Sequence, residues 1–383
     1  MEWGGLWQRP HHLAHEFSKR FKSVVYLQPA GLRNPRLSDI KRIKGFLTPK
    51  TSNYQHVQYN KTFQVKRLPF VPIQNLSIAE LINAKILDKF LTKIHHSKEA
   101  GPCLLWLAAP VPFLKRSLIL SKRLPTIFDW IDDYAIFHHL PKQVVDMQYK
   151  LLSMVDIVFA SSKILVNKAL KYRKKDVVYL PNGVDITHWN CKKNGELRRH
   201  LKLPYNSKIV GYFGTISHWI DKELVLETAT KRPELIFVFI GPRADQGLLD
   251  SIFRLKNCIH ITQVSYQRLP ELACDFDVCW MPFLVNDLTK TINPVKVYEY
   301  LAMGKPVVVP SFPDLEEVSD VLYLASSPLE WQQALEKAIT MPNHDLENMR
   351  RTTVRKGYSW EYIAQKALEA LLKANILTKG THV

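Results

Sequence analysis

One stretch constrains the fold more than any other, residues 293–309, which run Asn-Pro-Val-Lys-Val-Tyr-Glu-Tyr-Leu-Ala-Met-Gly-Lys-Pro-Val-Val-Val. Pro294 suits the first turn of a helix, where a missing amide hydrogen does no harm. Gly304 stands where a helix needs a left-handed cap, and the valines 307–309 are typical of a strand covered on both faces. The stretch therefore predicts a helix that starts at one end of a parallel sheet.

The start of this helix favours a bound phosphate, because the amides near Val295 and Lys296 have no partner within the helix. Glu299 lies one turn further in, where its carboxylate can accept hydrogen bonds from sugar hydroxyls. The alternative is that Lys296 and Glu299 are solvated residues on an ordinary helix.

The composition is typical of a globular protein, with 46% hydrophobic and 23% charged residues, and 383 residues suffice for two domains. We find no apolar run of about 18 residues and no signal peptide. The five cysteines show no paired metal spacing and need not be bridged, which suggests a reducing, cytoplasmic setting.

The formal net charge of +18 indicates an anionic partner, whether nucleic acid, phospholipid headgroups or a diphosphate-bearing substrate. Without zinc-finger spacing, a single-strand aromatic signature or a recognition helix, nucleic acid is the weakest of the three, and we predict no nucleic-acid partner. Basic residues cluster at 33–44, 115–123 and 168–175.

Buried strands alternate with amphipathic helices along the chain, which predicts mostly parallel sheets. The predicted strands are 24–27, 63–68, 104–107, 126–130, 157–160, 177–180, 209–213, 235–240, 259–262, 278–282 and 307–309. The predicted helices are 78–94, 144–154, 164–172 and 358–372, with others that begin near residues 10, 221, 246, 269 and 294.

This alternation restarts after a turn at residues 180–185 and a polar segment, so we expect two α/β domains. Their boundaries are 1–185 and 204–357, with a linker at 186–203 and a helix at 359–375 that returns to the first domain. Gly4 and Gly5 form a turn of the kind that follows a strand, so we expect that the first strand is missing or that the true start lies upstream.

Six segments, in this order, resemble the retaining glycosyltransferases of family four with the GT-B architecture, and most of all the branch of teichuronic acid and exopolysaccharide enzymes. The segments are 7–14 (Trp-Gln-Arg-Pro-His-His-Leu-Ala), 128–134 (Phe-Asp-Trp-Ile-Asp-Asp-Tyr), 180–185, 211–221, 293–309 and 359–361.

The resemblance implies two Rossmann-like domains facing a central cleft, with a nucleoside diphosphate sugar on the C-terminal domain and the acceptor on the other. It implies a metal-independent reaction without a cofactor that retains the anomeric configuration. Glu299 would bind the ribose, while Lys296, Val295 and the segment from Asn293 would face the diphosphate. Gly214 would let the backbone approach the phosphates.

The chain departs from the family pattern at two places. Thr291 occupies the position of the first glutamate of a common pair, so the usual carboxylate beside the donor sugar is missing. Thr215 follows Gly214 in place of an Arg–Lys pair, so Lys222 or Lys296 would supply the phosphate charge.

Asp133 follows a predicted buried strand, where it would orient the acceptor hydroxyl or stabilise positive charge at the anomeric carbon. The alternative is a loop aspartate that caps the next turn, and of Asp132 and Asp133 we expect one to be structural. Four further residues would line the cleft on the acceptor side: Gly4, Gly5, Arg9 and Trp219. Arg243 would meet the nucleobase or be solvated.

The sequence thus predicts a glycosyltransferase of cell-surface polysaccharide or glycolipid assembly, acting on a saccharide or lipid-linked acceptor. Apolar residues interleave with the basic cluster at 115–123, which suits transient contact with an anionic membrane surface at the inner face of the plasma membrane. A solvated helix face is the alternative. Rival functions are a nucleotide-sugar epimerase of GT-B fold and a non-catalytic nucleotide-sugar-binding relative.

Overall fold

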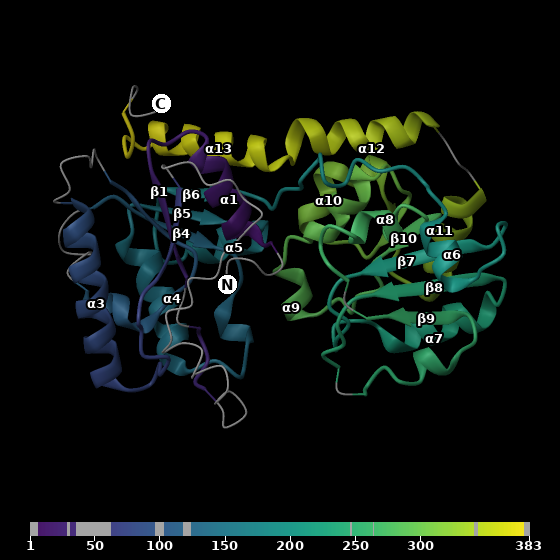
Figure 1. The fold of residues 1–383 in the computed structure, drawn as a ribbon, viewed down its shortest axis with the longest axis horizontal. Helices are drawn as coiled ribbons and strands as arrows, with labels where there is room; N and C mark the ends of the chain where they lie inside the picture. Colours follow the sequence, from purple (N-terminus) through teal and green to yellow (C-terminus); the bar gives the residue numbers. More distant parts are fainter. Residues whose placement is uncertain are drawn as a thin grey trace. The chain divides into compact units, whose positions relative to one another are not determined.

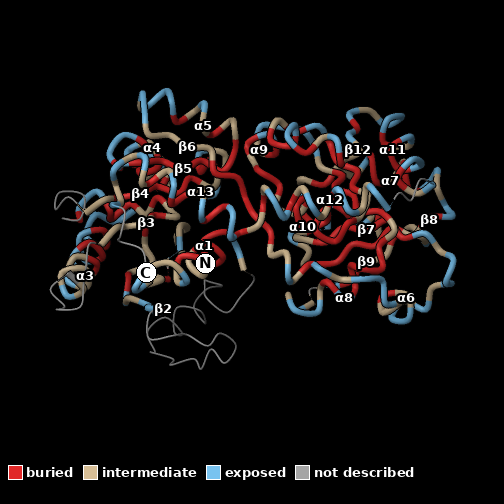
Figure 2. Tube along the Cα trace, turned by 90° about the horizontal axis from the view of Figure 1, so that it is seen from above, coloured by how far each residue is buried: buried red, intermediate tan, exposed pale blue. Residues whose placement is uncertain are grey.

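The computed structural model describes residues 7–28, 31–35, 63–95, 103–117, 124–245, 247–262, 264–340 and 344–378. These residues form two compact units, one from Met1–Pro181 with Ala364–Val383 and the other from Asn182–Ile363. Figure 2 shows that buried residues concentrate along the strands of each unit. Among the described helices, none is long and apolar enough to cross a bilayer.

The first unit contains a parallel sheet in the order β3-β4-β5-β6 and a separate parallel pair, β1-β2 (Figure 1). Its strands are β1 Val24–Gln28, β2 Phe63–Arg67, β3 Leu105–Leu107, β4 Thr126–Trp130, β5 Ile157–Ala160 and β6 Val177–Tyr179. Its helices are α1 Arg9–Ser18, α3 Ser77–His95, α4 Lys142–Met154 and α5 Lys163–Ala169, with 3-10 turns η2 Pro112–Arg116 and η4 Tyr134–Ile136. Every residue of β4 and β5 is buried, which explains their continuous apolar runs.

The second unit is built on one six-stranded parallel sheet in the order β12-β11-β10-β7-β8-β9. Its strands are β7 Lys208–Phe213, β8 Leu235–Ile240, β9 Cys258–Ile261, β10 Val278–Trp280, β11 Val307–Val309 and β12 Tyr323–Leu324. The chain runs outward from β7 to β9 and then returns to β10 on the other side of β7. The carboxyl ends of β7 and β10 therefore form a topological switch point, where ligands of such sheets bind.

Helices cover this sheet, with α7 and α11 in contact with each other and α10 in contact with α12 (Figure 1). The helices are α6 Glu196–Leu201, α7 Lys222–Lys231, α8 Leu269–Ala273, α9 Asp287–Lys290, α10 Val295–Ala302, α11 Pro328–Thr340 and α12 His344–Gly357, with 3-10 turns η5 Ile252–Arg254 and η6 Pro313–Val321. The last helix, α13 Trp360–Lys373, begins in the second unit, and its residues from Ala364 onward belong to the first.

Residues 293–309 form the predicted helix and strand. Pro294 is the N-cap of α10, and Gly304 follows its end at φ +75°. Gly304 N–H donates to the Leu301 carbonyl and Lys305 N–H to the Tyr300 carbonyl, which closes the helix in a left-handed cap. Because α10 leads directly into the parallel strand β11, its start lies at the carboxyl edge of the sheet.

The predicted helix near residue 246 is wrong. Residues 247–251 form turns, and the 3-10 turn η5 follows them. Gly247 has φ +88°, and Asp245 Oδ2 accepts a hydrogen bond from Leu249 N–H, so local side-chain bonding replaces a helical turn.

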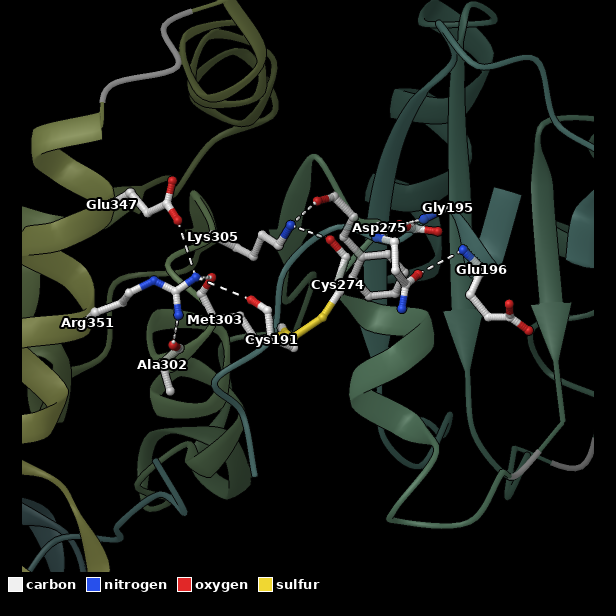
Figure 3. Close-up of a disulfide and its surroundings, with 12 residues drawn as sticks. Cys191, Gly195, Glu196, Cys274, Asp275, Ala302, Met303, Lys305, Glu347 and Arg351 are labelled. Atoms are coloured by element: carbon white, nitrogen blue, oxygen red, sulfur yellow. Dashed lines mark hydrogen bonds and ion pairs between the residues drawn. A yellow bond between two sulfur atoms is a disulfide. The ribbon is translucent and has the colours of Figure 1, made fainter. Parts of the chain in front are cut away.

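The sequence offers no reason to expect a bridge between cysteines, but a disulfide joins Cys191 to Cys274 across 83 residues of sequence (Figure 3). The segment that we predicted as a linker, 186–203, lies within the second unit. Asp275 next to the disulfide holds this segment, accepting hydrogen bonds from the backbone N–H groups of Gly195 and Leu197, each at 2.8 Å. The argument for a reducing compartment from cysteine usage therefore fails.

Candidate functional site

The loops after β7 and β10 are joined at the switch point of the second unit. Asp221 N–H donates to the Pro282 carbonyl, and Leu284 N–H donates to the Trp219 carbonyl, both at 2.8 Å. Asp221 also caps α7, where its carboxylate accepts a hydrogen bond from Leu224 N–H. Trp219, predicted on the acceptor side, thus lies in the second unit.

Gly214 is the first residue after β7 and has φ +144°. A Cβ at this position would lie 2.9 Å from Tyr212 Oη and 3.4 Å from Lys296 Cε. The glycine therefore allows the loop to pass directly beside the lysine at the start of α10, and its predicted approach to the phosphates stays a prediction.

Helix α10 places Lys296 and Glu299 together. Lys296 Nζ lies 2.8 Å from Glu299 Oε2, with the lysine side chain 32% exposed and the glutamate side chain 8% exposed. Burial raises the pKa of Glu299, and the neighbouring Lys296 partly opposes this. The carboxylate is neither solvated nor part of a plain helix surface, so the alternative of two solvated residues is wrong.

A group of stacked aromatic side chains adjoins this pair, and the sequence pattern did not predict it. Trp189 stacks on Phe213 with ring centroids 4.8 Å apart, and Lys296 Nζ lies 5.0 Å from the Phe213 centroid. His188 stacks on Tyr266 at 3.8 Å. His188 and Trp189 belong to the segment predicted as a linker, and Tyr266 lies between the strand predicted at 259–262 and the helix predicted near 269. None of the three lies in a predicted helix or strand, so no periodic pattern marks them.

Asn293 connects the start of the second unit to α10. Its Oδ1 accepts a hydrogen bond from Asn182 N–H at 2.9 Å, and its Nδ2 donates to Tyr298 Oη at 3.0 Å. Asn182 Nδ2 donates in turn to the Asn293 carbonyl. These bonds hold Asn293 against the start of α10, and its predicted role at the diphosphate stays a prediction.

Arg243 follows β8, and its charge is already balanced by protein. Its guanidinium lies 2.6 Å from both Asp245 Oδ2 and Asp250 Oδ1, and these carboxylates raise the pKa of the arginine. The guanidinium is therefore ion-paired and not simply solvated, and its predicted contact with the nucleobase stays a prediction. Lys222 opens α7 at the same edge of the sheet and is partly exposed.

In the first unit, Arg9 is an internal residue rather than part of a binding surface. Its side chain is buried against Asp129 on β4, with Nη2 2.8 Å from Oδ1, and its Nη1 donates to the Pro181 carbonyl. Trp106 Nε1 donates to the same carboxylate. Gly4 and Gly5 lie outside the described residues.

Asp132 and Asp133 both follow β4, but they differ in their hydrogen-bond partners. Asp133 accepts hydrogen bonds from Ala135 N–H and Gln148 Nε2, and its Oδ2 lies 2.6 Å from Lys168 Nζ. Asp133 is thus the loop aspartate that caps the next turn.

Asp132 has no hydrogen-bond partner among the described residues, although it is only partly exposed. Burial raises its pKa to about 6, Asp133 adds to the rise, and Arg9 opposes it. Of the two carboxylates, Asp132 is therefore the one whose polar atoms remain available to a ligand at the carboxyl end of β4.

A groove of about 470 Å³ opens on the same unit. Its lining includes Arg33 and Asn34 after β1, Asn75 after β2, and His139 and Gln143 beyond β4. Since the strands are parallel, these segments all follow carboxyl ends, as Asp132 does. None of the described lining residues is acidic.

Two of the three predicted basic clusters extend beyond the described residues, while the cluster at 168–175 is described in full, with Lys168 paired to Asp133 and Arg173 to Asp176. In the cluster at 115–123, Lys115 and Arg116 pair with Glu80 at 2.8 and 3.0 Å, and residues 118–123 lie outside the described residues. In the cluster at 33–44, residues beyond 35 are likewise outside them. The described basic residues of the cluster at 115–123 are therefore paired with a carboxylate, and they do not form an unbalanced cationic surface.

Comparison with known proteins identifies relatives, although no family model matches the chain. It is 23% identical over 237 residues to TuaH of Bacillus subtilis, which is named as a teichuronic acid biosynthesis glycosyltransferase. The matched region covers 60% of this chain and 59% of TuaH. It is 29% identical over 168 residues to WcaI of Escherichia coli, named as a colanic acid biosynthesis glycosyl transferase, which covers 41% of each. The chain thus matches less than two thirds of either relative.

Solved structures share the fold at low sequence identity. A glycosyltransferase from Rickettsia africae has a TM-score of 0.64 at 14% identity over 81% of this chain and 85% of its own. Anabaena Alr3699/HepE in complex with UDP and glucose has a TM-score of 0.62 at 16% identity over 92% and 99%. Sucrose-phosphate synthase from Thermosynechococcus elongatus has 0.60 at 15% over 83% and 84%. The chain is therefore related to the glycosyltransferases TuaH and WcaI, and its α/β fold with parallel sheets resembles that of GT-B glycosyltransferases.

Proposed function

We propose that this protein transfers a sugar from a nucleoside diphosphate sugar to a saccharide or lipid-linked acceptor, with retention of configuration, in cell-surface polysaccharide or glycolipid assembly. The names of TuaH and WcaI support the biosynthetic setting. The Anabaena protein, solved with UDP-glucose, supports a nucleotide-sugar donor. The proposal includes two domains that face a cleft, and a location at the cytoplasmic face of the membrane.

The observation that carries the proposal is the meeting of Gly214, Lys296 and Glu299 at the start of α10. The amides at the start of α10 and the lysine suit the two phosphates. Negative charge grows on this diphosphate leaving group as the glycosidic bond breaks, and the amides and the lysine would stabilise it. The buried carboxylate suits the ribose hydroxyls, because a hydrogen bond to a charged acceptor is stronger than one to a neutral acceptor.

The acceptor would lie on the first unit, near Asp132. A carboxylate with a raised pKa can orient the acceptor hydroxyl or accept its proton close to neutral pH. The groove beside Arg33 offers polar side chains for further sugar units.

One observation favours a second candidate, a non-catalytic nucleotide-sugar-binding relative. Thr291 stands in place of the carboxylate beside the donor sugar, and its hydroxyl donates to the Leu288 carbonyl at 2.8 Å. Such a protein would bind a nucleotide sugar without consuming it.

The first test is a thermal-shift screen of UDP-, GDP-, dTDP- and ADP-sugars. A donor at 100 times its dissociation constant stabilises the folded state by about 2.7 kcal/mol, which raises Tm by roughly 5–10 °C. Lys296→Ala should abolish this shift, while the matched control Lys290→Ala on the exposed end of α9 should keep it. No shift with any donor would refute the nucleotide-sugar site.

The second test incubates the stabilising donor with and without saccharide acceptors and follows the sugar by mass and NMR. Transfer or slow hydrolysis with retention supports the transferase. Binding without any turnover supports the non-catalytic relative, and conversion of the donor into an epimer refutes transfer.

A further inference from the structure

Helix α3 exposes large apolar side chains where a helix on a folded domain usually carries polar ones. Ile78 is 68% exposed, Leu81 43% and Ile82 42%, and Leu76, just before the helix, is 47% exposed. Clustered exposed apolar residues commonly mark a surface that contacts a partner or a membrane.

Three lysines continue the same face toward the end of the helix. Lys85, Lys89 and Lys93 are exposed, and no described residue forms an ion pair or hydrogen bond with their side chains. At 3.6 residues per turn, they and the three apolar residues fall within an arc of about 120°. We call these six residues the α3 face: Ile78, Leu81, Ile82, Lys85, Lys89 and Lys93.

Both acidic residues of α3 lie outside this arc, Glu80 on the opposite side of the helix and Asp88 about 20° beyond Leu81. Glu80 is buried and pairs with Lys115 and Arg116, and Asp88 accepts a hydrogen bond from Ser117 Oγ. Two cations therefore neutralise Glu80, whereas the neutral Ser117 hydroxyl leaves the charge of Asp88 in place. Along α3, three exposed lysines thus face one carboxylate at the edge of the face, which leaves the face net positive. The α3 face is both apolar and cationic.

We propose that the α3 face docks the protein on an anionic lipid bilayer. A bilayer supplies an apolar layer for the isoleucines and leucine and phosphate groups for the lysines, side by side along the helix. A second copy of this chain fits poorly, since it would bring lysines against lysines on a protein of net charge +18. This inference rests on the proposed function for its purpose, which is to meet a lipid-linked acceptor.

The test measures flotation of the intact protein with vesicles, without nucleotide sugar, so that its result is independent of donor binding and transfer. Vesicles of phosphatidylcholine alone are compared with vesicles that contain 30% phosphatidylglycerol, the fraction being about that of an anionic leaflet. Wild type should bind the anionic vesicles and release at high salt.

Two sets of variants probe the face, and two matched controls remove the same groups elsewhere. The face variants are K85Q/K89Q/K93Q and I78S/I82S. The controls are K208Q/K256Q/K337Q, three exposed lysines of the second unit, and L248S/L329S, two exposed leucines of the same unit.

Each lysine contributes about fivefold to the affinity for an anionic surface, so the triple face variant should bind about 100-fold more weakly. The isoleucine variant should lose at least about tenfold. Both controls should bind anionic vesicles with an affinity within a few-fold of wild type. The lysine control and the lysine face variant have the same net charge, so a difference between them reports the position of the lysines.

Equal loss in the lysine face variant and its control would overturn the proposal, because binding would then follow net charge alone. Absence of wild-type binding to anionic vesicles would overturn it as well. Light scattering adds a further check: if the face variants turn a dimer into a monomer without changing vesicle binding, the face joins two copies instead. If the α3 face binds an acidic protein, and neither type of vesicle displaces that protein, the result would also count against the proposal.

Discussion

Replacement of Asp132 by asparagine should stabilise the protein, and the gain should grow with pH. The folded protein raises the pKa of Asp132 from 3.8 to about 6, so it holds this proton more tightly than the unfolded chain does. The contribution of the protonated Asp132 carboxyl group to the free energy of unfolding is fully present below pH 3.8. It is lost as the pH rises through about 6, because the folded protein must then release the proton. The ionised carboxylate therefore destabilises the fold at neutral pH.

The magnitude follows from the two pKa values. The wild-type penalty is about 1.5 kcal/mol near pH 5 and approaches about 3 kcal/mol at pH 8, an upper value because Asp132 is partly exposed. Asp132→Asn should recover most of this, while Asp133→Asn should lose about 1 kcal/mol, because an amide nitrogen in place of Oδ2 cannot accept from the partly exposed Lys168. The amide oxygen of the asparagine can still accept from Gln148. Asp146→Asn, at an exposed position on α4, is the control that should change little.

Urea unfolding of these variants at several pH values between 5 and 8 provides the measurement. If Asp132→Asn is no more stable than wild type at pH 8, or if its gain does not rise with pH, then Asp132 has a partner in solution and the assignment of roles is wrong. Under the proposed function the same variant should lose sugar transfer, so that a more stable protein would be an inactive one.

Three further predictions test other parts of the site. Glu299→Gln should weaken donor binding by roughly 10–150-fold in calorimetry, since a hydrogen bond to a charged group contributes about 1.5–3 kcal/mol, without destabilising the free protein, because it removes a buried charge. Arg9→Met should cost about 3–5 kcal/mol in urea unfolding, because the buried Asp129 carboxylate loses its partner, and Asp129→Asn in the same background should recover part of that loss. Reduction of the Cys191–Cys274 bond should lower Tm by an amount that corresponds to about 2–5 kcal/mol, and an unchanged Tm with dithiothreitol would show that the bond does not form in solution.

The strands were predictable because burial on both faces leaves a continuous apolar run. Four strands, β4, β5, β8 and β11, have the bounds that the sequence predicts. The helix near residue 246 was not predictable, since the competing bonds of Asp245 and Arg243 depend on side chains that a hydrophobic pattern does not register.

The site was predictable only where its residues are close in sequence. Lys296 and Glu299 are one helical turn apart, so periodicity alone brings them together. Trp189 and Phe213 stack across 24 positions of sequence, and Cys191 reaches Cys274 across 83, so neither contact leaves a local pattern.

The pair formed by Lys296 and Glu299 links these observations to the proposed chemistry. In the free protein Lys296 donates a hydrogen bond to the buried Glu299 carboxyl group, and it lies beside the loop at Gly214. A diphosphate at the start of α10 would compete for that lysine, and the carboxylate would then need a new donor, which ribose hydroxyls can provide. Phosphate and ribose binding should therefore be coupled, so a donor that lacks one of these groups should lose more affinity than that group's own hydrogen bonds account for.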